Sequence, residues 1–330
     1  MEDGLDMGEL LDPFVKMLEA CCPPETVKQI EGGGDYAALW DAVEQSGYLQ
    51  SLVPEDCGGF GLGLAEVSPL LMAIGAQTVP LPLGETMIAR ALVAGSPAAE
   101  VAGPIALVCA DAAGPSLVPY GLVCDLVLAD VGSELLLFDI RTMPRGLTGV
   151  YGSIDAWIDL GEVGFGQTVT RPANGLRSLA ALNCAAAISG AAEAVLNMTV
   201  TYANERVQFG KPIGRQQALQ QQLAVMAEDV VAVRLAVQLA CQGAFPPAEI
   251  PAASAKAIAS AAAARIAATA HGLFGAIGIS EEHHLQRYSR RLHAWRQAFG
   301  SEQFWQMKIG DARLQSGQRS VDWVRETFQV

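Results

Sequence analysis

One stretch decides the fold of this 330-residue chain: Tyr202-Ala-Asn-Glu-Arg-Val-Gln-Phe-Gly-Lys-Pro-Ile-Gly-Arg-Gln-Gln217. We expect one helix to end near Arg206, a turn to follow at Phe209-Gly210, and a second helix to begin at Gln216-Gln217. Arg206 and Lys211 are cationic, Phe209 offers a flat apolar face, and the start of the second helix has free N–H groups that attract anions. A dinucleotide pyrophosphate with a ring beside it fits these groups. The spacing alone fits an ordinary corner between two helices equally well.

The same stretch resembles the R-x-Q/T-F-G-K signature of the acyl-CoA dehydrogenase family. In that family the Arg and the Phe reach across a dimer interface to the FAD of the neighbouring subunit. The resemblance therefore implies that Arg206 and Phe209 bind FAD, and it extends this role to Gln208, Gln216 and Gln217.

A second loop, His271-Gly-Leu-Phe-Gly-Ala-Ile-Gly278, resembles the Q-x-x-G-G-x-G loop that meets the adenine and pyrophosphate of the neighbouring FAD. Gly272 stands where Gln is usual, and Ala276 stands where the second Gly is usual. Gly275 remains, so the resemblance implies an FAD-contacting role for it. We expect no metal at the adjacent His283 and His284, because no third ligand follows at a sensible spacing.

The composition narrows the classes of function. The chain is 51% hydrophobic and carries a net charge of −14, which argues against nucleic-acid and anionic-membrane partners. Its seven cysteines have no metal-binding spacing, which favours a reducing cytoplasm. The segment Met1–Glu9 carries four acids, so we expect no signal peptide, and charged residues interrupt the apolar segment Ile250–Ile279, so we expect no membrane span.

The pattern of residues divides the chain into three domains. Residues 1–102 are predicted to form an N-terminal α-helical domain, residues 103–173 a reduced middle β domain, and residues 174–330 a C-terminal four-helix bundle. The helices predicted in the first domain span Tyr36–Gln45, with Asp35 as N-cap and Gly47 as the stop, Leu64–Gln77 and Glu85–Val93.

Short β-rich runs mark the middle domain and predict a small antiparallel barrel or sandwich. They span Ile105–Cys109, Leu122–Ala129, Glu134–Ile140 and Ala156–Leu160. Apolar residues then recur at steps of three and four and predict the seam of a bundle: Leu223, Met226, Val230, Val233 and Val237. This order resembles the acyl-CoA dehydrogenase fold, so the expected fold class is α+β, mainly α.

The positions that carry the catalytic base in the family are empty here. The base is a Glu that removes the α-proton while hydride passes from the β-carbon to the flavin. Gly300 occupies one position of this Glu, and Ala180 and Ala181 occupy the other, within a run (174–192) that contains no acid. We therefore expect no catalytic residue in this chain.

In the family, the middle domain holds one half of the FAD site for its own subunit, which we call the cis half. The sequence motif of this cis half is largely missing here. The nearest match to its T-E-P-x-x-G-S-D motif is Leu107–Ser116, in which only Gly114 and Ser116 are serviceable. The half given to the neighbouring subunit, the trans half, looks kept. A chain that keeps only the residues it contributes to a neighbouring subunit's FAD site is expected to pair with a subunit of a different sequence.

This combination resembles the short subunits of the α2β2 acyl-CoA dehydrogenases of bacterial steroid side-chain degradation, on the segment Leu285–Glu302. The resemblance implies a flavoprotein oxidoreductase of lipid metabolism that desaturates a bulky acyl-CoA with a shared FAD. It further implies a homologous larger subunit as partner, which supplies the base, and an electron-transfer flavoprotein as acceptor.

Two alternatives remain open. One is a self-sufficient homo-oligomeric enzyme with a displaced base, for which Glu302 and Glu281 are the candidates. Glu302 also fits the first turn of a helix after Ser301, where acids are favoured by the helix dipole. The other alternative is a flavin-free interaction protein on the same fold.

Overall fold

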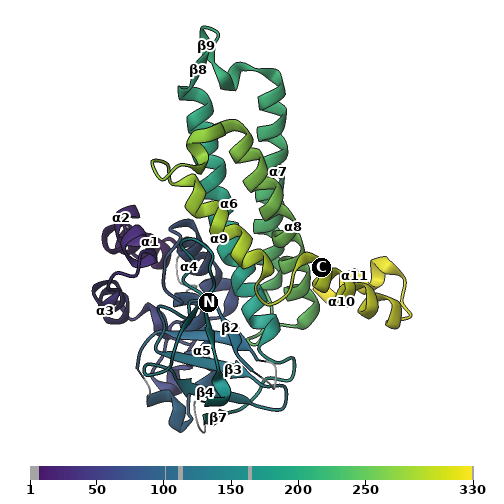
Figure 1. Cartoon of the computed structure of the whole chain (residues 1–330). Helices are drawn as coiled ribbons and strands as arrows, with labels where there is room; N and C mark the ends of the chain where they lie inside the picture. Colours follow the sequence, from purple (N-terminus) through teal and green to yellow (C-terminus); the bar gives the residue numbers. More distant parts are fainter. Residues whose placement is uncertain (1–6, 101, 111–113, 163–165, 329–330) are drawn as a thin grey trace. The chain divides into compact units, whose positions relative to one another are not determined.

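The computed structural model describes residues 7–100, 102–110, 114–162 and 166–328. By the density of its contacts the chain forms two compact units. Unit 1 contains residues up to 70, 79–183 and 244–246, and unit 2 contains residues 71–78, 184–243 and 247 onward. Helices dominate and the strands are short, which confirms the predicted α+β, mainly α, fold class (Figure 1).

The helices described in unit 1 are α1 (Met7–Cys21), α2 (Pro24–Glu31), α3 (Ala37–Ser46), α4 (Leu64–Ala76, shared with unit 2) and α5 (Leu83–Val93). Limits were predicted for the last three, and each begins and ends within two residues of them. Asp35 Oδ1 accepts a hydrogen bond from the Ala37 N–H at 2.9 Å, and Gly47 ends α3 at φ 79°, in the left-handed region that glycine adopts without strain. The predicted stop at Gly47 is thus confirmed, whereas the N-cap is Tyr36 rather than the predicted Asp35, and the helix begins at Ala37, one residue later than predicted.

The strands of unit 1 form two small sheets. Their bounds are β1 (Ile105–Cys109), β2 (Ser116–Val118), β3 (Leu126–Asp130), β4 (Leu135–Asp139), β5 (Gly146–Leu147), β6 (Ala156–Ile158) and β7 (Gln167–Val169). The order is β1-β3-β4-β7 in one sheet and β2-β6-β5 in the other. Strand β1 pairs with β3 in parallel, so the prediction of an all-antiparallel sheet was wrong. A parallel pair leaves no local sequence signal, because its strands are joined by a distant crossover.

A buried polar link connects the larger sheet to the start of helix α6 (Arg177–Glu205). The Asp130 carboxylate, at the end of β3, accepts hydrogen bonds from Arg171 Nε at 2.8 Å and from the Leu176 N–H at 2.9 Å. These bonds, together with one from the Gly132 N–H, outweigh burial and lower the pKa of Asp130. The link holds the first turn of α6 against the sheet.

Unit 2 is helical apart from one hairpin. Besides most of α6 it contains α7 (Gln217–Ala240), α8 (Glu249–Phe274), α9 (Leu285–Gln297), α10 (Glu302–Gln315) and α11 (Ser320–Phe328). The hairpin strands β8 (Val207–Gln208) and β9 (Lys211–Pro212) separate α6 from α7. Met226, Val230, Val233 and Val237 are buried along α7, as the predicted seam requires, and Leu223 is partly buried.

Small residues let the helices of unit 2 approach closely. A Cβ atom added to Gly190 of α6 would lie 1.8 Å from the Met72 carbonyl oxygen of α4, so only glycine permits this crossing. Helices α6 and α8 are also long and apolar enough to span a membrane by length and composition. The apolar window of α6 is 83% buried and that of α8 is 44% buried, and core helices of bundles share this composition.

Candidate functional site

The signature stretch forms a β-hairpin where the sequence predicted only a turn. Val207 pairs with Pro212, and Gln208 pairs with Lys211. The two residues at the tip, Phe209 and Gly210, have φ angles of 53° and 76°. Positive φ at both central residues is typical of the type I′ turn, which matches the twist of a two-residue hairpin. The strands are too short to show a period of two, so periodicity could not predict them.

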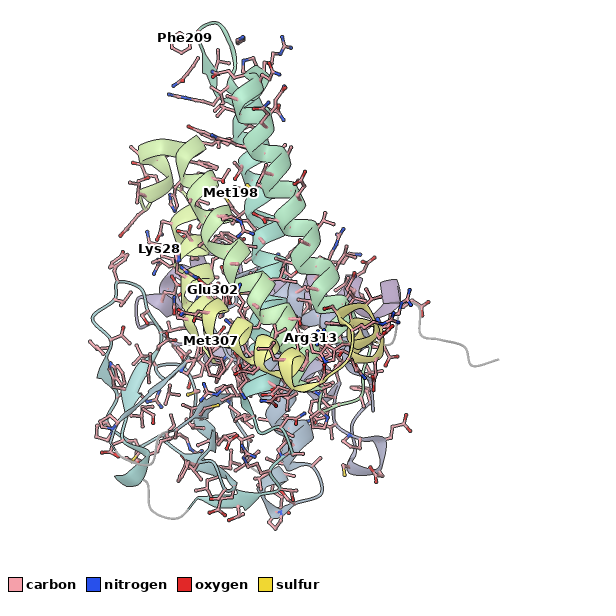
Figure 2. The ribbon with its side chains drawn as sticks, turned by 90° about the vertical axis from the view of Figure 1, so that its right-hand side faces the viewer. Lys28, Met198, Phe209, Glu302, Met307 and Arg313 are labelled. Atoms are coloured by element: carbon pink, nitrogen blue, oxygen red, sulfur yellow. The ribbon has the colours of Figure 1, made fainter. Side chains whose placement is uncertain are left out.

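Phe209 is the most exposed large apolar side chain in the described part of the chain, at 93%. A left-handed backbone is uncommon for a bulky residue, and Asn or Gly would serve the same turn without strain. The chain therefore accepts both backbone strain and apolar exposure to hold this ring at the tip. Figures 1 and 2 show the hairpin at one end of the helices of unit 2, with Phe209 outermost.

The base of the hairpin is held firmly to the helices. Ala203 of α6, Ile213 and Leu273 of α8 form a buried cluster, against which Leu219 and Leu223 of α7 pack. The Arg206 N–H donates to the Tyr202 carbonyl at 2.8 Å, and the Arg206 carbonyl accepts from the Ile213 N–H at 2.9 Å. The Arg206 side chain itself is exposed. The cationic group thus projects into solvent from an ordered backbone.

The second predicted loop lies at the same end of the bundle. Phe274 stacks on Tyr202 with ring centroids 4.2 Å apart and an interplanar angle of 18°, and it also contacts His283 at 4.5 Å. Gly275 follows directly, exposed, at φ 62° and ψ −140°, with no atom within 4 Å of the place a Cβ would take. Its backbone is therefore open to a ligand at a position that only glycine adopts without strain.

The predicted glutamines complete this end of the bundle. Gln216 is the residue before α7 and makes no side-chain capping bond, and Gln217 is the first residue of the helix and is exposed. The structure thus gathers all six predicted FAD-binding residues at the ends of α6 and α8 and the start of α7. We call this region the hairpin end; its predicted members are Arg206, Gln208, Phe209, Gln216, Gln217 and Gly275.

The hairpin end fits the outer part of a dinucleotide in chemical type. Two cations, Arg206 and Lys211, suit a pyrophosphate, and the N-terminus of α7 offers backbone N–H groups. Phe209 offers an aromatic face, and Gly275 allows close approach of the backbone. Of the segment predicted to hold FAD in cis, Asp111–Ala113 lie outside the described residues; Gly114 has φ 83°, and Ser116 begins β2.

The predicted loop position of the base is filled by aromatic side chains. A Cβ atom added to Gly300 would lie 2.6 Å from Phe304 Cδ1 and 2.8 Å from Trp305 Nε1, and Gly300 has φ 109°. A glutamate there would need both rings to move and the backbone to adopt a strained angle. At the other base position, Ala180 and Ala181 are fully buried. Neither position therefore has room for a carboxylate without rearrangement.

Glu302 is held in an ion pair rather than poised to accept a proton. It is the first residue of α10, and the Arg296 guanidinium donates to both of its carboxylate oxygens, the Nε bond being 3.0 Å long. This pairing lowers the pKa of Glu302, whereas a general base at neutral pH needs a raised one. Glu302 also lies far down the bundle from Phe209 (Figure 2). Glu281, the other candidate, is exposed.

A buried lysine is the main feature of unit 2 that sequence analysis missed. Lys256 of α8 is fully buried, and its ammonium donates to Ser260 Oγ at 2.9 Å, to the Trp295 carbonyl at 2.5 Å and to the Arg296 carbonyl at 2.9 Å. Burial lowers its pKa to about 8. In the sequence Lys256 is one of several charges in an Ala-rich helix, whereas the structure shows that it caps the last turn of α9.

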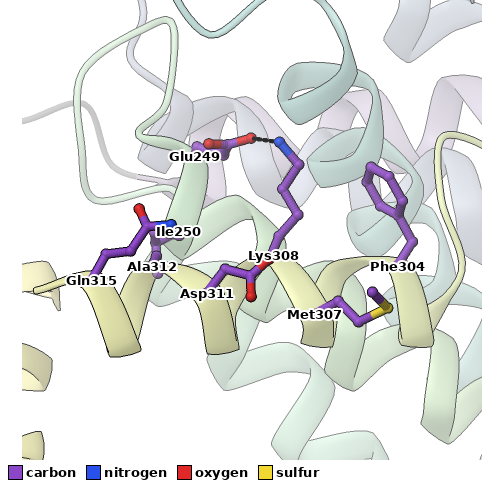
Figure 3. Close-up of a pocket in the computed structure, with 8 residues that line it drawn as sticks. All are labelled: Glu249, Ile250, Phe304, Met307, Lys308, Asp311, Ala312 and Gln315. Carbon is purple, nitrogen blue, oxygen red and sulfur yellow. Dashed lines mark hydrogen bonds and ion pairs between the residues drawn. The ribbon is translucent and has the colours of Figure 1, made fainter.

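A separate hollow of about 360 Å³ lies between the start of α8 and one face of α10 (Figure 3). Phe304 and Met307 line one part of it, and Glu249 and Lys308 bind each other at 2.9 Å beside it. The acid and the amine are thus engaged with each other. Among the residues with described coordinates, no three His, Cys, Asp or Glu side chains come together as a metal-binding group.

Comparison with known proteins gives one consistent family. Residues 175–314 match the family model "Acyl-CoA dehydrogenase, C-terminal domain". The chain is 33% identical over 300 residues to the acyl-CoA dehydrogenase IpdE2 of Mycolicibacterium smegmatis, covering 88% of this chain and 93% of that protein. It is 31% identical over 280 residues to the acyl-CoA dehydrogenase FadE27 of Mycobacterium tuberculosis, covering 71% and 74%.

Two solved structures show the same fold. A chain of the ChsE4-ChsE5 complex from Mycobacterium tuberculosis superposes with a TM-score of 0.78 at 24% identity, covering 96% of this chain and 99% of that one. A chain of the Tcur3481-Tcur3483 steroid ACAD superposes with a TM-score of 0.82 at 22% identity, covering 94% and 99%. The helical bundle, the small β region and the hairpin end therefore belong to one known architecture.

Proposed function

The chain belongs to the acyl-CoA dehydrogenase family, and from that premise we propose that it is one subunit of a heteromeric FAD-dependent enzyme. In this proposal a homologous larger subunit holds most of the FAD and supplies the catalytic base. This chain completes the site in trans with Arg206, Gln208, Phe209, Gln216, Gln217 and Gly275. The assembly is α2β2, and the site lies in the cytoplasm.

One observation carries the proposal: the hairpin end presents an exposed aromatic ring, cations and an open glycine backbone to the outside of this chain. The 93% exposure of Phe209 is costly in water unless another molecule covers it. When bound, FAD supplies the acceptor for the hydride that leaves the β-carbon of the acyl-CoA. Arg206 and Lys211 would neutralise its pyrophosphate, and Phe209 would cover a ring.

The filled base position supports a division of labour between two subunits. Gly300 faces Phe304 and Trp305, and Glu302 is paired with Arg296. Gly300 and the pair Ala180 and Ala181 occupy the two positions at which the family carries its base, so neither position has a carboxylate in this chain. The α-proton must then be removed by a carboxylate of another subunit, because the thioester-activated C–H bond needs a general base.

The comparisons support the partner and the substrate class. Both solved structures carry the names of two different polypeptides, ChsE4-ChsE5 and Tcur3481-Tcur3483, and the second is named as a steroid ACAD. We therefore propose a bulky acyl-CoA as substrate, of the steroid side-chain class. An electron-transfer flavoprotein is the proposed acceptor of the electrons from reduced FAD.

The experiment is to purify the chain alone and after co-expression with a larger homologue from the same genome, and to record the visible absorption spectrum of each. The proposal expects a flavin spectrum from the pair and none from this chain alone. A flavin spectrum from the chain alone would favour a self-sufficient enzyme. Absence of flavin from both would favour an interaction protein without flavin.

A further inference from the structure

The loop between α8 and α9, residues 275–284, holds Gly275 at the hairpin end (Figure 1). Seven of its ten residues are exposed, Gly278 is buried, and Ser280 and His283 are half-buried. His283 is thus the largest side chain of this loop that packs against the bundle. The backbone around Gly275 therefore depends on few inward contacts. We call these ten residues the Gly275 loop.

His283 belongs to a stack of three rings that begins on α6. Tyr202 of α6 stacks on Phe274 with ring centroids 4.2 Å apart, and His283 packs against Phe274 with centroids 4.5 Å apart. Phe274 is the last residue of α8 and directly precedes Gly275. The imidazole therefore holds the point at which the Gly275 loop leaves the helix.

The same imidazole caps the first turn of α9. Its Nδ1 accepts a hydrogen bond from the Leu285 N–H at 3.1 Å, and Leu285 is the first residue of α9. The first amides of a helix have no carbonyl partner within the helix, so an acceptor from a preceding side chain stabilises them. A ring nitrogen that accepts an N–H bond carries no hydrogen of its own, so this contact is made by the neutral imidazole with its hydrogen on Nε2.

The middle of the loop packs between the two residues that His283 contacts. A Cβ atom added to Gly278 would lie 2.9 Å from Phe274 Cβ and 3.0 Å from Leu285 Cδ2. The backbone at Gly278 thus fits closely between the end of α8 and the start of α9. His283 holds both of these ends, so it fixes the loop from the residue before it and from the residue after it.

Protonation of His283 removes one of these contacts. An imidazolium carries hydrogen on both nitrogens, so Nδ1 can no longer accept the bond from the Leu285 N–H. The new charge also lies at the N-terminal end of α9, where the helix dipole disfavours a cation. An attraction between the cation and the Phe274 ring acts in the opposite direction, but it supplies no acceptor for Leu285. Burial, and after it the charge of His284, lowers the pKa of His283.

The ionisable groups around His283 come from four segments: Tyr202 on α6, His271 on α8, His284 and Arg287 at the start of α9, and Glu281 and Glu282 in the loop. Of these, His271 is the other group that titrates near the pH at which His283 does. Its Nε2 lies 2.9 Å from Ser289 Oγ, and burial, and after it the charge of His293, lowers its pKa. An experiment must therefore separate the two histidines.

We propose that His283 is a positioning residue of the hairpin end: the neutral imidazole holds the Gly275 loop in the conformation that receives the cofactor, and protonation loosens the loop. The statement about the cofactor rests on the proposed function, whereas the statement about the loop does not. As pH falls below about 6.5, the open loop takes up a proton before the closed loop does, so acid favours opening.

The first test measures hydrogen exchange of the loop amides and of the Leu285 amide, in the chain alone and in the complex. Exchange is recorded from about pH 7.5 to about pH 5, across the range in which histidine titrates, and is expressed as protection relative to an unstructured peptide. Wild-type protection should fall at least about threefold on acidification, because one backbone hydrogen bond is lost. Protection that does not change with pH in the wild type overturns the proposal.

Three variants assign this response to one ring. His283→Asn should show no pH response, because the Asn oxygen accepts an N–H bond two residues ahead and does not titrate. His283→Phe keeps a ring without an acceptor and should leave the Leu285 amide poorly protected at every pH. His271→Gln is the matched control and should keep the wild-type response. A response that survives in His283→Asn, or that His271→Gln abolishes, contradicts the role of His283.

The second test titrates the deflavinated complex with FAD at the same pH values. Wild-type affinity should fall on acidification in parallel with the protection of the loop, and His283→Asn should lose less affinity over the same range. An equal loss in both proteins would show that His283 does not position the cofactor site. A complex that binds no FAD at any pH would contradict the proposed function, whereas the exchange measurement would still decide whether His283 controls the loop.

Discussion

At the scale of single residues, the account depends most on Arg206. Its side chain is exposed, and its backbone N–H and carbonyl are both bonded within the base of the hairpin. We expect Arg206→Ala to lower the affinity of the assembled complex for FAD by roughly ten- to a hundred-fold, since a charge-assisted contact is worth about 1.5–3 kcal/mol. The melting temperature of this chain should not change.

Equilibrium titration of the deflavinated complex with FAD measures this effect. Arg319→Ala is the control, because Arg319 is an exposed arginine that follows α10 in the sequence and binds Asp322 at 2.7 Å. Wild-type affinity in the Arg206→Ala complex would show that Arg206 does not contact the cofactor.

Phe209 gives a second test at the same scale. Phe209→Ala keeps a Cβ at φ 53°, so the backbone strain of the turn is retained and only the ring is lost. We expect weaker FAD binding by the complex and, because an exposed ring is removed, unchanged or better solubility of the free chain. The same titration checks this, with Leu314→Ala as a matched loss of an exposed apolar side chain. Equal affinities for the two variants would refute a role for the ring.

Glu302 tests the absence of a base in this chain. We expect Glu302→Gln to leave turnover of the complex within about threefold of wild type, whereas loss of a general base costs about 10²–10⁴-fold. Since pairing with Arg296 lowers the folded pKa of Glu302, its contribution to stability is present above the unfolded pKa and is lost as pH falls through the folded value. Steady-state turnover and a melting curve at neutral pH check both parts. A thousand-fold loss of turnover at unchanged stability would make Glu302 the base.

At the scale of elements, Lys256 joins α8 to the end of α9. Three acceptors, Ser260 Oγ and two carbonyls of the last turn of α9, match the three N–H bonds of an ammonium. Those carbonyls are at the negative end of the helix dipole, so a cation suits them. Lys256 thus binds the end of α9 just before the turn that contains Gly300. The ion pair between Arg296 and Glu302 spans the same turn.

The lowered pKa of Lys256 predicts a pH dependence. Burial sets the folded pKa at about 8 against 10.5 in the unfolded chain, so between these values the unfolded chain binds more protons. The stability of the wild type relative to Lys256→Met should therefore rise with pH from about 8 to about 10.5, by on the order of 3 kcal/mol. Urea unfolding of the wild type and of Lys256→Met at several pH values measures this difference. A difference in unfolding free energy between the wild type and Lys256→Met that does not change with pH would contradict the lowered pKa of Lys256.

Sequence patterns predicted elements well where the signal is local. The apolar run Ile105–Cys109 is a strand with the predicted limits, and α4 begins at the predicted Leu64. The short strands β2, β5 and β7 show no period and were missed, whereas β6 lies within the predicted run Ala156–Leu160. The parallel pairing of β1 with β3 was missed because no short window contains both strands. The hairpin at Val207–Pro212 was missed because its two-residue strands are too short to show a period of two.

The candidate site, too, could be predicted from the sequence only in part. The resemblance predicted which residues lie at the hairpin end, and the structure brings these six together. Only the three-dimensional structure reveals that Phe209 is 93% exposed and that two aromatic rings fill the space beside Gly300. Lys256 could not be found from sequence, because its acceptors are carbonyls about 40 residues away.

At the scale of the whole molecule, two regions carry the proposed function. In the proposal the hairpin end faces a larger homologue and its FAD, whereas the region around Gly300 is filled by this chain's own side chains. Together these features support the proposal of a subunit that contributes to a neighbour's site and depends on that neighbour for the base. The proposed assembly has two copies of each subunit and one FAD for each pair.

Native mass spectrometry of the complex tests this central claim most directly, because it counts polypeptides and bound cofactors in one measurement. The account predicts two copies of this chain, two copies of the larger homologue and two FAD molecules, and no FAD on this chain when it is purified alone. A homo-oligomer of this chain that carries one FAD per polypeptide would contradict it.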